Sequence, residues 1–226
     1  MTTSTTTLSA QEFMRKAMDG ERQFQGIRLP EGQNDFTQDA AALQAFNKYM
    51  RAQDLRTDPV IADGADWRGA HAQGLVLPYS KLPKADLRGA DLREADVRRT
   101  DFTEAQLQGS DVSMATLVGA RLQGADLSDA VMRATDLYEA GTAGVILCRA
   151  DMTGALLFRI SLKDADLTDA NVFMAQSYRA DLRGVKGLET VKGLGTVRFH
   201  KLMVTARERE LVEAALRSGP MFEVLD

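Results

Sequence analysis

The sequence has very little cysteine and few aromatic residues. Its 226 residues include a single cysteine, Cys148, which excludes a framework of internal disulfide bonds. Aromatic residues make up only 6% of the chain, although 44% of the residues are hydrophobic. The core must therefore be built mainly from aliphatic side chains, and a narrow, regular structure suits them better than a conventional globular core.

The sequence also lacks an excess of one charge and any long apolar run. Lys and Arg total 28 and Asp and Glu total 32, which gives a formal net charge of −4. This balance argues against non-specific binding to DNA or to anionic membranes, which requires a basic surface. No run approaches the roughly 18 apolar residues of a membrane span, and the Thr-rich stretch 1–7 does not resemble a secretory signal. Together with the single cysteine, these absences predict a reduced, cytoplasmic protein.

What the sequence does contain is a repeat of five residues. Residues 85–99, for example, read ADLRG ADLRE ADVRR. With the large apolar residue taken as the centre of each pentad, centres recur without a slip from Trp67 to Leu182, in 24 consecutive pentads. The centre is Trp, Leu, Val, Phe or Met in 21 of them, and the residue two positions earlier is Ala, Ser or Thr in 21. Two inward-facing positions therefore recur in every pentad.

A period of five fits neither an α-helix, which buries residues at intervals of about 3.6, nor a strand, which buries every second residue. Two inward positions separated by one outward position instead predict a short extended leg followed by a tight turn. Four such legs close a square coil of about 20 residues, and coils stack at the inter-strand spacing of about 4.8 Å. The residue before the centre is Asp or Asn in 12 of the 24 pentads, which suits the turns.

These pentads resemble the pentapeptide-repeat family, whose pattern is A-(D/N)-L-x-x, and the match covers residues 65–184. The resemblance implies an all-β fold, a right-handed quadrilateral β-helix. Twenty-four pentads make six coils, about 29 Å long at 4.8 Å per coil. We expect four regions: an N-terminal tail and capping helix over 1–20, a partial coil and inserted helix over 21–61, the β-helix over 62–187 and a C-terminal cap over 188–226.

The segments before the repeat predict two helices. Ser9 and Glu12 form a capping-box pattern, so a helix is expected from about Ala10 to Asp19. Phe24 and Leu29 resemble the centres of a first partial coil, but in a different register from the later centres, which indicates an insertion. Residues 37–56 have helical spacing of apolar residues, and Asp58-Pro59 ends them. A helix cannot join the stack, so we expect it to cover an open β edge.

After Gly187 the repeat pattern fails. Thr205 and Glu208 form a second capping-box pattern, which predicts a helix to about Arg217, stopped by Gly219-Pro220. An apolar stripe runs along this helix: Leu211, Val212, Ala215 and Leu216. Stacked repeats need end caps, and the family resemblance implies that this end can also carry a two-fold dimer contact. A monomer cap and a homodimer both stay open, and we favour the dimer.

One face of the coil carries aromatic and arginine residues, because residues 20 apart stack on the same face. We call it the aromatic-Arg face; its outward column after the centre is Val118, Tyr138, Phe158 and Tyr178, and Arg99, Arg159 and Arg179 stand one residue further along. Phe173 lies on the neighbouring face. Aromatic and Arg residues dominate binding hot spots, so this surface is a candidate partner site. Alternatively, the column is an internal ladder, or is covered by residues 188–204 or 37–56.

Two other faces carry columns of Asp before the centre, for example Asp86, Asp126 and Asp166. In the resembled family, members that protect DNA gyrase act as acidic mimics of duplex DNA. Residues 62–186 contain 18 acidic and 15 basic side chains, which is a weak charge for such a mimic. Turn formation explains most of these carboxylates.

No catalytic constellation is visible in the sequence. The two histidines, His71 and His200, are far apart, and neither has a metal-ligand spacing around it. Cys148 follows the centre Leu147 and faces outward without a neighbouring base. We therefore expect no enzyme, no metal and no cofactor.

The prediction is a non-catalytic protein-binding protein with no direct contact to nucleic acid or membrane. The family resemblance implies a type II topoisomerase, particularly DNA gyrase, as partner, with protection against antibiotics or toxins as the outcome. The alternative is a scaffolding module that binds another protein client through the aromatic-Arg face.

Overall fold

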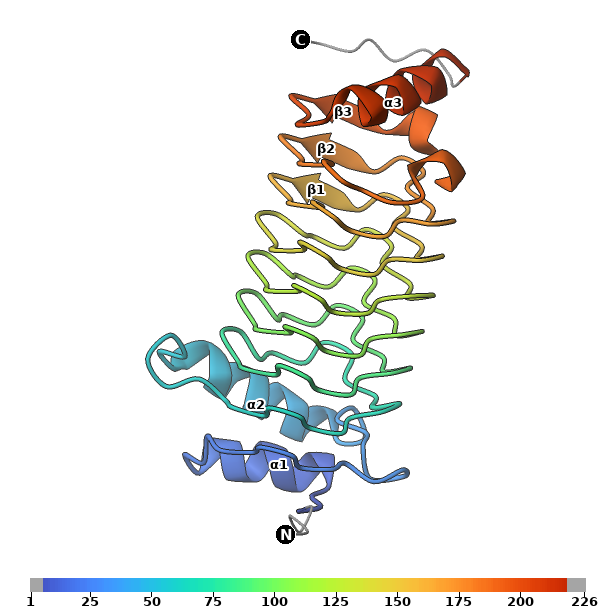
Figure 1. Ribbon diagram of the computed structural model, residues 1–226. Helices are drawn as coiled ribbons and strands as arrows, with labels where there is room; N and C mark the ends of the chain where they lie inside the picture. The colour runs from blue at the N-terminus through green and yellow to red at the C-terminus, as the bar shows by residue number, and fades with distance from the viewer. Residues whose placement is uncertain (1–5, 219–226) are drawn as a thin grey trace, which may run out of the picture.

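A computed structural model of the chain describes residues 6–218, which form a stack of coils with helices at both ends (Figure 1). Residues 20 apart form parallel β-bridges at four points of each coil, as in Asp86↔Gln106, Asp91↔Asp111, Asp96↔Thr116 and Asp101↔Arg121. The bridges confirm the predicted 20-residue coil, with four pairing points in each coil. The right-handed sense and the square outline stay expectations from the family resemblance.

Regular strands are short and few within residues 6–218, because most legs contribute one bridging residue between two turns. Three-residue strands form only on the aromatic-Arg face near the C-terminal end: β1 (Leu156–Phe158), β2 (Gln176–Tyr178) and β3 (Arg198–His200), which pair in parallel in that order. They carry the last part of the predicted aromatic column.

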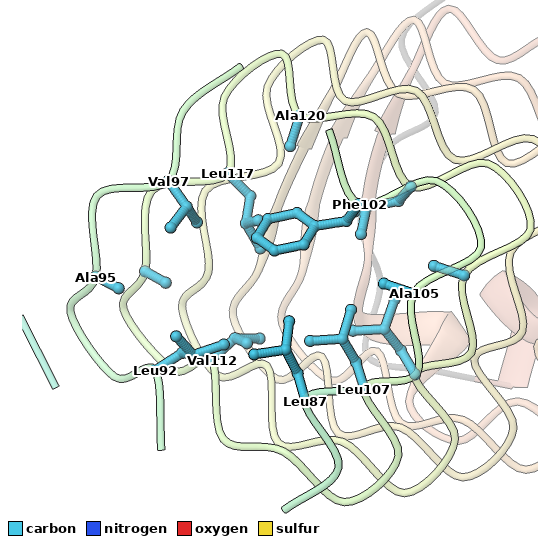
Figure 2. Packing of buried hydrophobic residues seen from close by; sticks show 14 of the residues in the cluster. Leu87, Leu92, Ala95, Val97, Phe102, Ala105, Leu107, Val112, Leu117 and Ala120 are labelled. Carbon is cyan, nitrogen blue, oxygen red and sulfur yellow. The ribbon is translucent and has the colours of Figure 1, made fainter. Parts of the chain in front are cut away.

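The axis of the stack is filled by the two inward positions of each pentad. Leu87, Leu107 and Leu127 are each at most 2% exposed, and Figure 2 shows centre residues from all four sides meeting in the interior, with alanines lining the walls. Thr142, which replaces an apolar centre, is also buried, and its hydroxyl donates to the Ser161 carbonyl oxygen at 2.7 Å. The bond offsets the cost of burying a hydroxyl.

Every pentad turns at the residue two positions after the centre, which we call the corner. All corners from Gly64 to Gly184 have a positive φ, including those occupied by Arg, Glu, Asp, Met, Lys, Tyr and Ala. Glycine adopts this left-handed conformation freely, whereas other residues incur a cost of about 1 kcal/mol. A corner residue other than glycine therefore keeps its side chain at a cost in backbone strain.

The N-terminal end is closed by a plug of aromatic rings. Helix α1 (Ala10–Met18) begins at Ser9 with the predicted capping box. It buries Phe13 against Phe24 and Trp67, with ring centroids 4.6 and 5.1 Å apart, and against Phe36 at 5.9 Å. The predicted partial coil is confirmed, since Gln23 bridges Ile61 and Arg28 bridges Asp66. Much of the scarce aromatic content is concentrated here.

The inserted helix α2 (Ala40–Ala52) is shorter than the predicted range 37–56. Asp39 caps its first turn by accepting from the Ala42 N–H, and at Gln53 the backbone is extended. The helix buries Phe46 and packs on α1 at the N-terminal end of the stack (Figure 1). It covers the open end of the coils, as expected.

Asn47 of α2 takes the place of a leg that is missing from the first, partial coil. The leg at Val76 bridges Asp96 on one side, but α2 lies where its other neighbour would be. The Asn47 amide oxygen accepts from the Val76 N–H at 2.9 Å, and its Nδ2 donates to the Gly74 carbonyl oxygen at 2.8 Å. One side-chain amide thus satisfies the Val76 N–H, which a further coil would have bonded, and also binds the neighbouring Gly74 carbonyl.

The stack continues beyond the predicted boundary at residue 187, so that expectation needs correction. Asp166 bridges Lys186 at the usual interval of 20, but Asn171 bridges Lys192, and Asp181 bridges Met203 at an interval of 22. The extra residues form two 3₁₀ turns, η1 (Leu188–Thr190) and η2 (Leu194–Thr196). Two legs of six residues therefore complete a last coil that the five-residue pattern does not reveal.

Helix α3 (Ala206–Ser218) follows this last coil, as predicted, and packs on η1 and η2 (Figure 1). The Glu208 carboxylate accepts from the Thr205 N–H at 2.7 Å and from the Gly184 N–H at 3.2 Å. It thereby links the helix to the coil beneath it. The predicted stop at Gly219-Pro220 lies outside the described residues.

We expect Asn47→Ala to destabilise the N-terminal end, because the Val76 N–H and the Gly74 carbonyl lose their partners. Leaving such groups unpaired costs about 1–3 kcal/mol. Amide hydrogen exchange should show loss of protection at Val76, together with a lower denaturant midpoint. Lys48→Ala, at the exposed neighbouring position, is the control, and equal effects of both variants would contradict the role of Asn47.

Candidate protein-binding face

The predicted aromatic column lies on one face of the stack and is partly open to solvent. Val118, Tyr138, Phe158 and Tyr178 are all half-buried. Phe158 and Tyr178 are register partners at the ends of β1 and β2. Each side chain therefore buries part of its neighbour in the column and leaves the rest exposed.

The last coil extends this column instead of folding over it. Tyr178 pairs with His200 of β3, and the two rings are stacked with centroids 5.0 Å apart and planes at 17°. Residues 188–204 were one candidate cover for the column, but part of this segment forms its next member. The sequence analysis missed His200 because it lies 22 residues after Tyr178 rather than 20. The two successive six-residue segments KGLETV and KGLGTV were the signal in the sequence that could have revealed this longer coil.

The inserted segment reaches the N-terminal part of the aromatic-Arg face and lies over the first coils. Residues 50–56, at the end of α2 and after it, line a cleft of about 540 Å³ together with Pro78, Tyr79 and Arg98. None of the column residues from Val118 to Tyr178 lines this cleft.

The three arginines of the face occupy corners. Arg159 forms an ion pair with Glu139 at 2.8 Å and donates to the Tyr138 hydroxyl at 3.3 Å. The Arg179 guanidinium lies 5.3 Å from the centre of the Tyr178 ring, in a cation–π contact. Arg99 is exposed further toward the N-terminal end. Arg159 and Arg179 thus form one surface with the rings, and the structure shows no contact between Arg99 and a ring in the described residues.

An apolar edge borders the same surface near β2. Phe173 is 45% exposed and Met174 is 62% exposed, although both are large apolar side chains. Met174 is a corner, and its N–H donates to the Thr196 hydroxyl at 2.8 Å. From Phe173 to Arg179 one stretch of chain therefore presents an apolar edge, an aromatic ring and a cation in sequence.

The Asp columns on the other faces serve the turns. Asp91 accepts from the Arg93 backbone N–H at 3.2 Å and holds its guanidinium through two bonds of 2.8 and 2.6 Å. The bond to the Arg93 side chain lowers the pKa of the Asp91 carboxyl. The Asp166 carboxylate accepts from both the N–H and the hydroxyl of Thr168, and the bond from the hydroxyl lowers the pKa of Asp166. These carboxylates are engaged within the chain, as the turn interpretation predicts.

The single cysteine and the histidines do not form a reactive group. Burial raises the pKa of the Cys148 thiol, and its hydrogen bond with Asp166 adds to the effect, so little thiolate forms at neutral pH. His71 lines a cleft of about 580 Å³ together with residues from the segments 28–38 and 66–69, whereas His200 lies in the aromatic column. Within residues 6–218 no group of three or more His, Cys, Asp or Glu side chains is arranged to hold a metal ion.

The predicted apolar stripe of the C-terminal helix faces the chain's own core. Val212 is buried, and Leu211, Ala215 and Leu216 are partly buried against the core cluster. Packing on the last coil is sufficient to explain the stripe. In the described part of the chain, no helix has the length and apolar character needed to cross a membrane.

Comparison with known proteins agrees with this architecture. Residues 60–93, 80–117 and 115–154 match the sequence model of the family "Pentapeptide repeats", with 8 copies in the chain. Residues 60–154 therefore consist of pentapeptide repeats. The repeats continue beyond the matched residues, to the pentad centred on Leu182.

Solved structures of pentapeptide-repeat proteins are similar to this one. HetL from the cyanobacterium Nostoc sp. strain PCC 7120, a protein involved in regulation of heterocyst differentiation, is 23% identical with a TM-score of 0.62; the match covers 87% of this chain and 77% of HetL. This likeness shows the shared fold. No curated protein sequence matches the chain.

Two further likenesses are weaker and support no argument. A trypsin-treated form of QnrB1, a plasmid-mediated fluoroquinolone resistance protein, is 16% identical with a TM-score of 0.36, over 72% of this chain and 87% of QnrB1. Rfr23 from the cyanobacterium Cyanothece 51142 is 28% identical with a TM-score of 0.24, over 44% of this chain and 64% of Rfr23.

We expect Asp91→Asn to keep the turn and lose the ion pair, because an amide oxygen also accepts from the Arg93 N–H. The cost at pH 7 should be about 0.5–1 kcal/mol, as for partly exposed pairs. Since the pKa of Asp91 is lower in the folded chain, the contribution is complete above about pH 5 and is lost as the pH falls through the folded-state pKa.

Urea denaturation at a series of pH values measures this difference. The wild type and Asp91→Asn should converge as the pH falls through the lowered pKa of Asp91, because the carboxylate is then protonated in both states. Asp91→Ala, which also removes the acceptor of the turn, should remain less stable throughout. A constant gap between wild type and Asp91→Asn from pH 7 to pH 2 would contradict the assignment.

Proposed function

We propose that the protein is a non-catalytic binding protein whose aromatic-Arg face contacts a protein partner. The observation that carries the proposal is the continuous column of Tyr138, Phe158, Tyr178 and His200, half-exposed and flanked by Arg159 and Arg179. Half-exposed aromatic rings beside arginines have the composition of binding hot spots.

Stability alone does not account for the corners of this face. Corners favour glycine, yet the column from Tyr79 to Lys201 contains one glycine in seven positions, Gly119. On the opposite face, three of the six corners from Gly69 to Asp169 are glycine. Retaining Arg99, Arg159 and Arg179 at strained positions favours a role in contact with another molecule.

The first partner to test is a type II topoisomerase, DNA gyrase above all, because the family resemblance implies it. Partial mimicry of DNA is the less supported mode of binding, since many of the carboxylates on the Asp columns are already bonded to Arg, Thr or Ser side chains two residues later. A scaffolding role with another protein client would use the same aromatic-Arg face.

A supercoiling assay with purified DNA gyrase tests the specific partner. We expect the wild-type chain to inhibit supercoiling or to protect the enzyme from a quinolone at micromolar concentration. Neither effect at that concentration would remove gyrase as the partner and leave the scaffolding alternative.

We expect Tyr138→Ala/Phe158→Ala to weaken binding to the partner at least about tenfold, because truncating hot-spot aromatics typically costs about 2 kcal/mol. Binding is measured by pull-down and titration with the purified partner. Ile146→Ala, which removes a 38%-exposed apolar side chain on the opposite face, is the matched control. Unchanged binding by the double variant would mean that the column is not the site.

A homodimer through the C-terminal end remains a proposal from the family resemblance. Solution mass tests it directly, since the monomer has a mass of 24.7 kDa. A dimer that dissociates in Leu216→Glu would support the contact, whereas a monomer at all concentrations would exclude it.

A further inference from the structure

The aromatic-Arg face is cationic, although the whole chain has a net charge of −4. Its outward positions between Val76 and Lys201 carry six cationic side chains: Arg98, Arg99, Arg159, Arg179, Arg198 and Lys201. They carry three carboxylates: Asp96, Asp136 and Glu139. The opposite face has the reverse balance, with Asp the commonest charged residue.

All three carboxylates of the face already have partners. Asp96 binds the Arg98 guanidinium at 2.8 Å, and Glu139 binds Arg159 at 2.8 Å. Asp136 accepts from the Tyr138 backbone N–H at 3.0 Å. Positive charge therefore remains after these pairs are formed.

That positive charge is concentrated on corners. Within residues 6–218, Arg99, Arg179 and Lys201 have no carboxylate within ion-pair distance. Arg179 and Lys201 lie on successive coils beside Tyr178 and His200. Two uncompensated cations thus flank the stacked end of the column, where a binding partner can supply the missing negative charge.

The rings are placed for contact with a polypeptide rather than with nucleic-acid bases. Tyr178 has His200 against one side and the Arg179 guanidinium over its ring. Binding of single-stranded nucleic acid uses free ring faces on which bases stack. Here contacts within the column occupy these faces, whereas the cations and the exposed Phe173 and Met174 remain available.

We propose that the partner docks an acidic segment, with an apolar anchor residue, across β1, β2 and β3. Its carboxylates pair with Arg179 and Lys201, and its apolar side chain rests on Phe173 and Met174 at the other edge of the face. This inference rests on the proposed function, because it specifies the chemistry of the partner at the same site.

The test is a titration with synthetic peptides followed by fluorescence anisotropy and by amide chemical shifts. The probe is a labelled 12-residue peptide of Asp and Glu with two Leu residues. A second peptide has Asn and Gln in place of the acids, and single-stranded oligothymidylate serves as a polyanion without side chains. We expect the acidic peptide to bind, to shift amides on β1–β3, and to be released by salt.

Arg179→Gly is the decisive variant, because glycine fits the positive φ of 54° at this corner and the fold is retained. Arg149→Gly is the matched control: Arg149 is a corner on the opposite face with φ of 59°, so charge and backbone change equally. We expect Arg179→Gly to weaken binding of the acidic peptide roughly five- to tenfold and Arg149→Gly to leave it within about twofold.

Three results would overturn the inference: equal losses in both variants, binding of the amide peptide as tight as that of the acidic one, or tighter binding of oligothymidylate through Arg179. The inference would also be overturned if the acidic peptide caused no change in amide chemical shifts at concentrations up to about 1 mM, since weaker binding would have no functional use. The proposed function fails separately, when Tyr138→Ala/Phe158→Ala leaves binding of the protein partner unchanged.

Discussion

Hydrogen bonds between successive coils are the interaction on which the remainder of the structure depends. Each leg donates to both neighbouring coils and accepts from both. The Asp86 N–H bonds to the Ala65 carbonyl of one neighbour, and the Leu87 N–H bonds to the Gln106 carbonyl of the other. The bonds between interior coils need no side chains, and Asp carboxylates bind further N–H groups in the turns. The two ends lack one neighbouring coil, and buried unpaired backbone groups are costly. The helices, the Asn47 amide and the Glu208 carboxylate all lie at these ends.

The pentad divides its five positions between structure and surface. Two positions fill the axis of the stack. The residue before the centre is often Asp, whose carboxylate accepts from the backbone N–H two residues later and is therefore already hydrogen-bonded within the chain. The position after the centre and the corner are freest to differ from one coil to the next. On the aromatic-Arg face these two positions carry the rings and the cations, which is why the candidate site is a pair of parallel columns.

Most of the fold could be predicted from the sequence, because the period of five is unbroken from Trp67 to Leu182 and each capping box marks one helix start. The ends of the inserted helix were less accurate, since Thr37 bonds to Asp35 in a turn and Asp39 caps the helix later than the apolar spacing indicated. The last coil was missed because its legs contain six residues, and with it His200 and Lys201. The contact between Tyr178 and His200 depends on three-dimensional register, which five-residue periodicity cannot provide.

The six-residue legs of the last coil also bear on self-association. Gly187 and Gly193 sit so close to the backbone of Thr168 and Phe173 that a side chain would collide there. Their legs change the register from 20 residues to 22, and the extra residues form the turns η1 and η2. Helix α3 packs on both turns and lies over this end of the stack. Growth into filaments, the hazard of any open β edge, is therefore opposed by the helix that these legs hold in place.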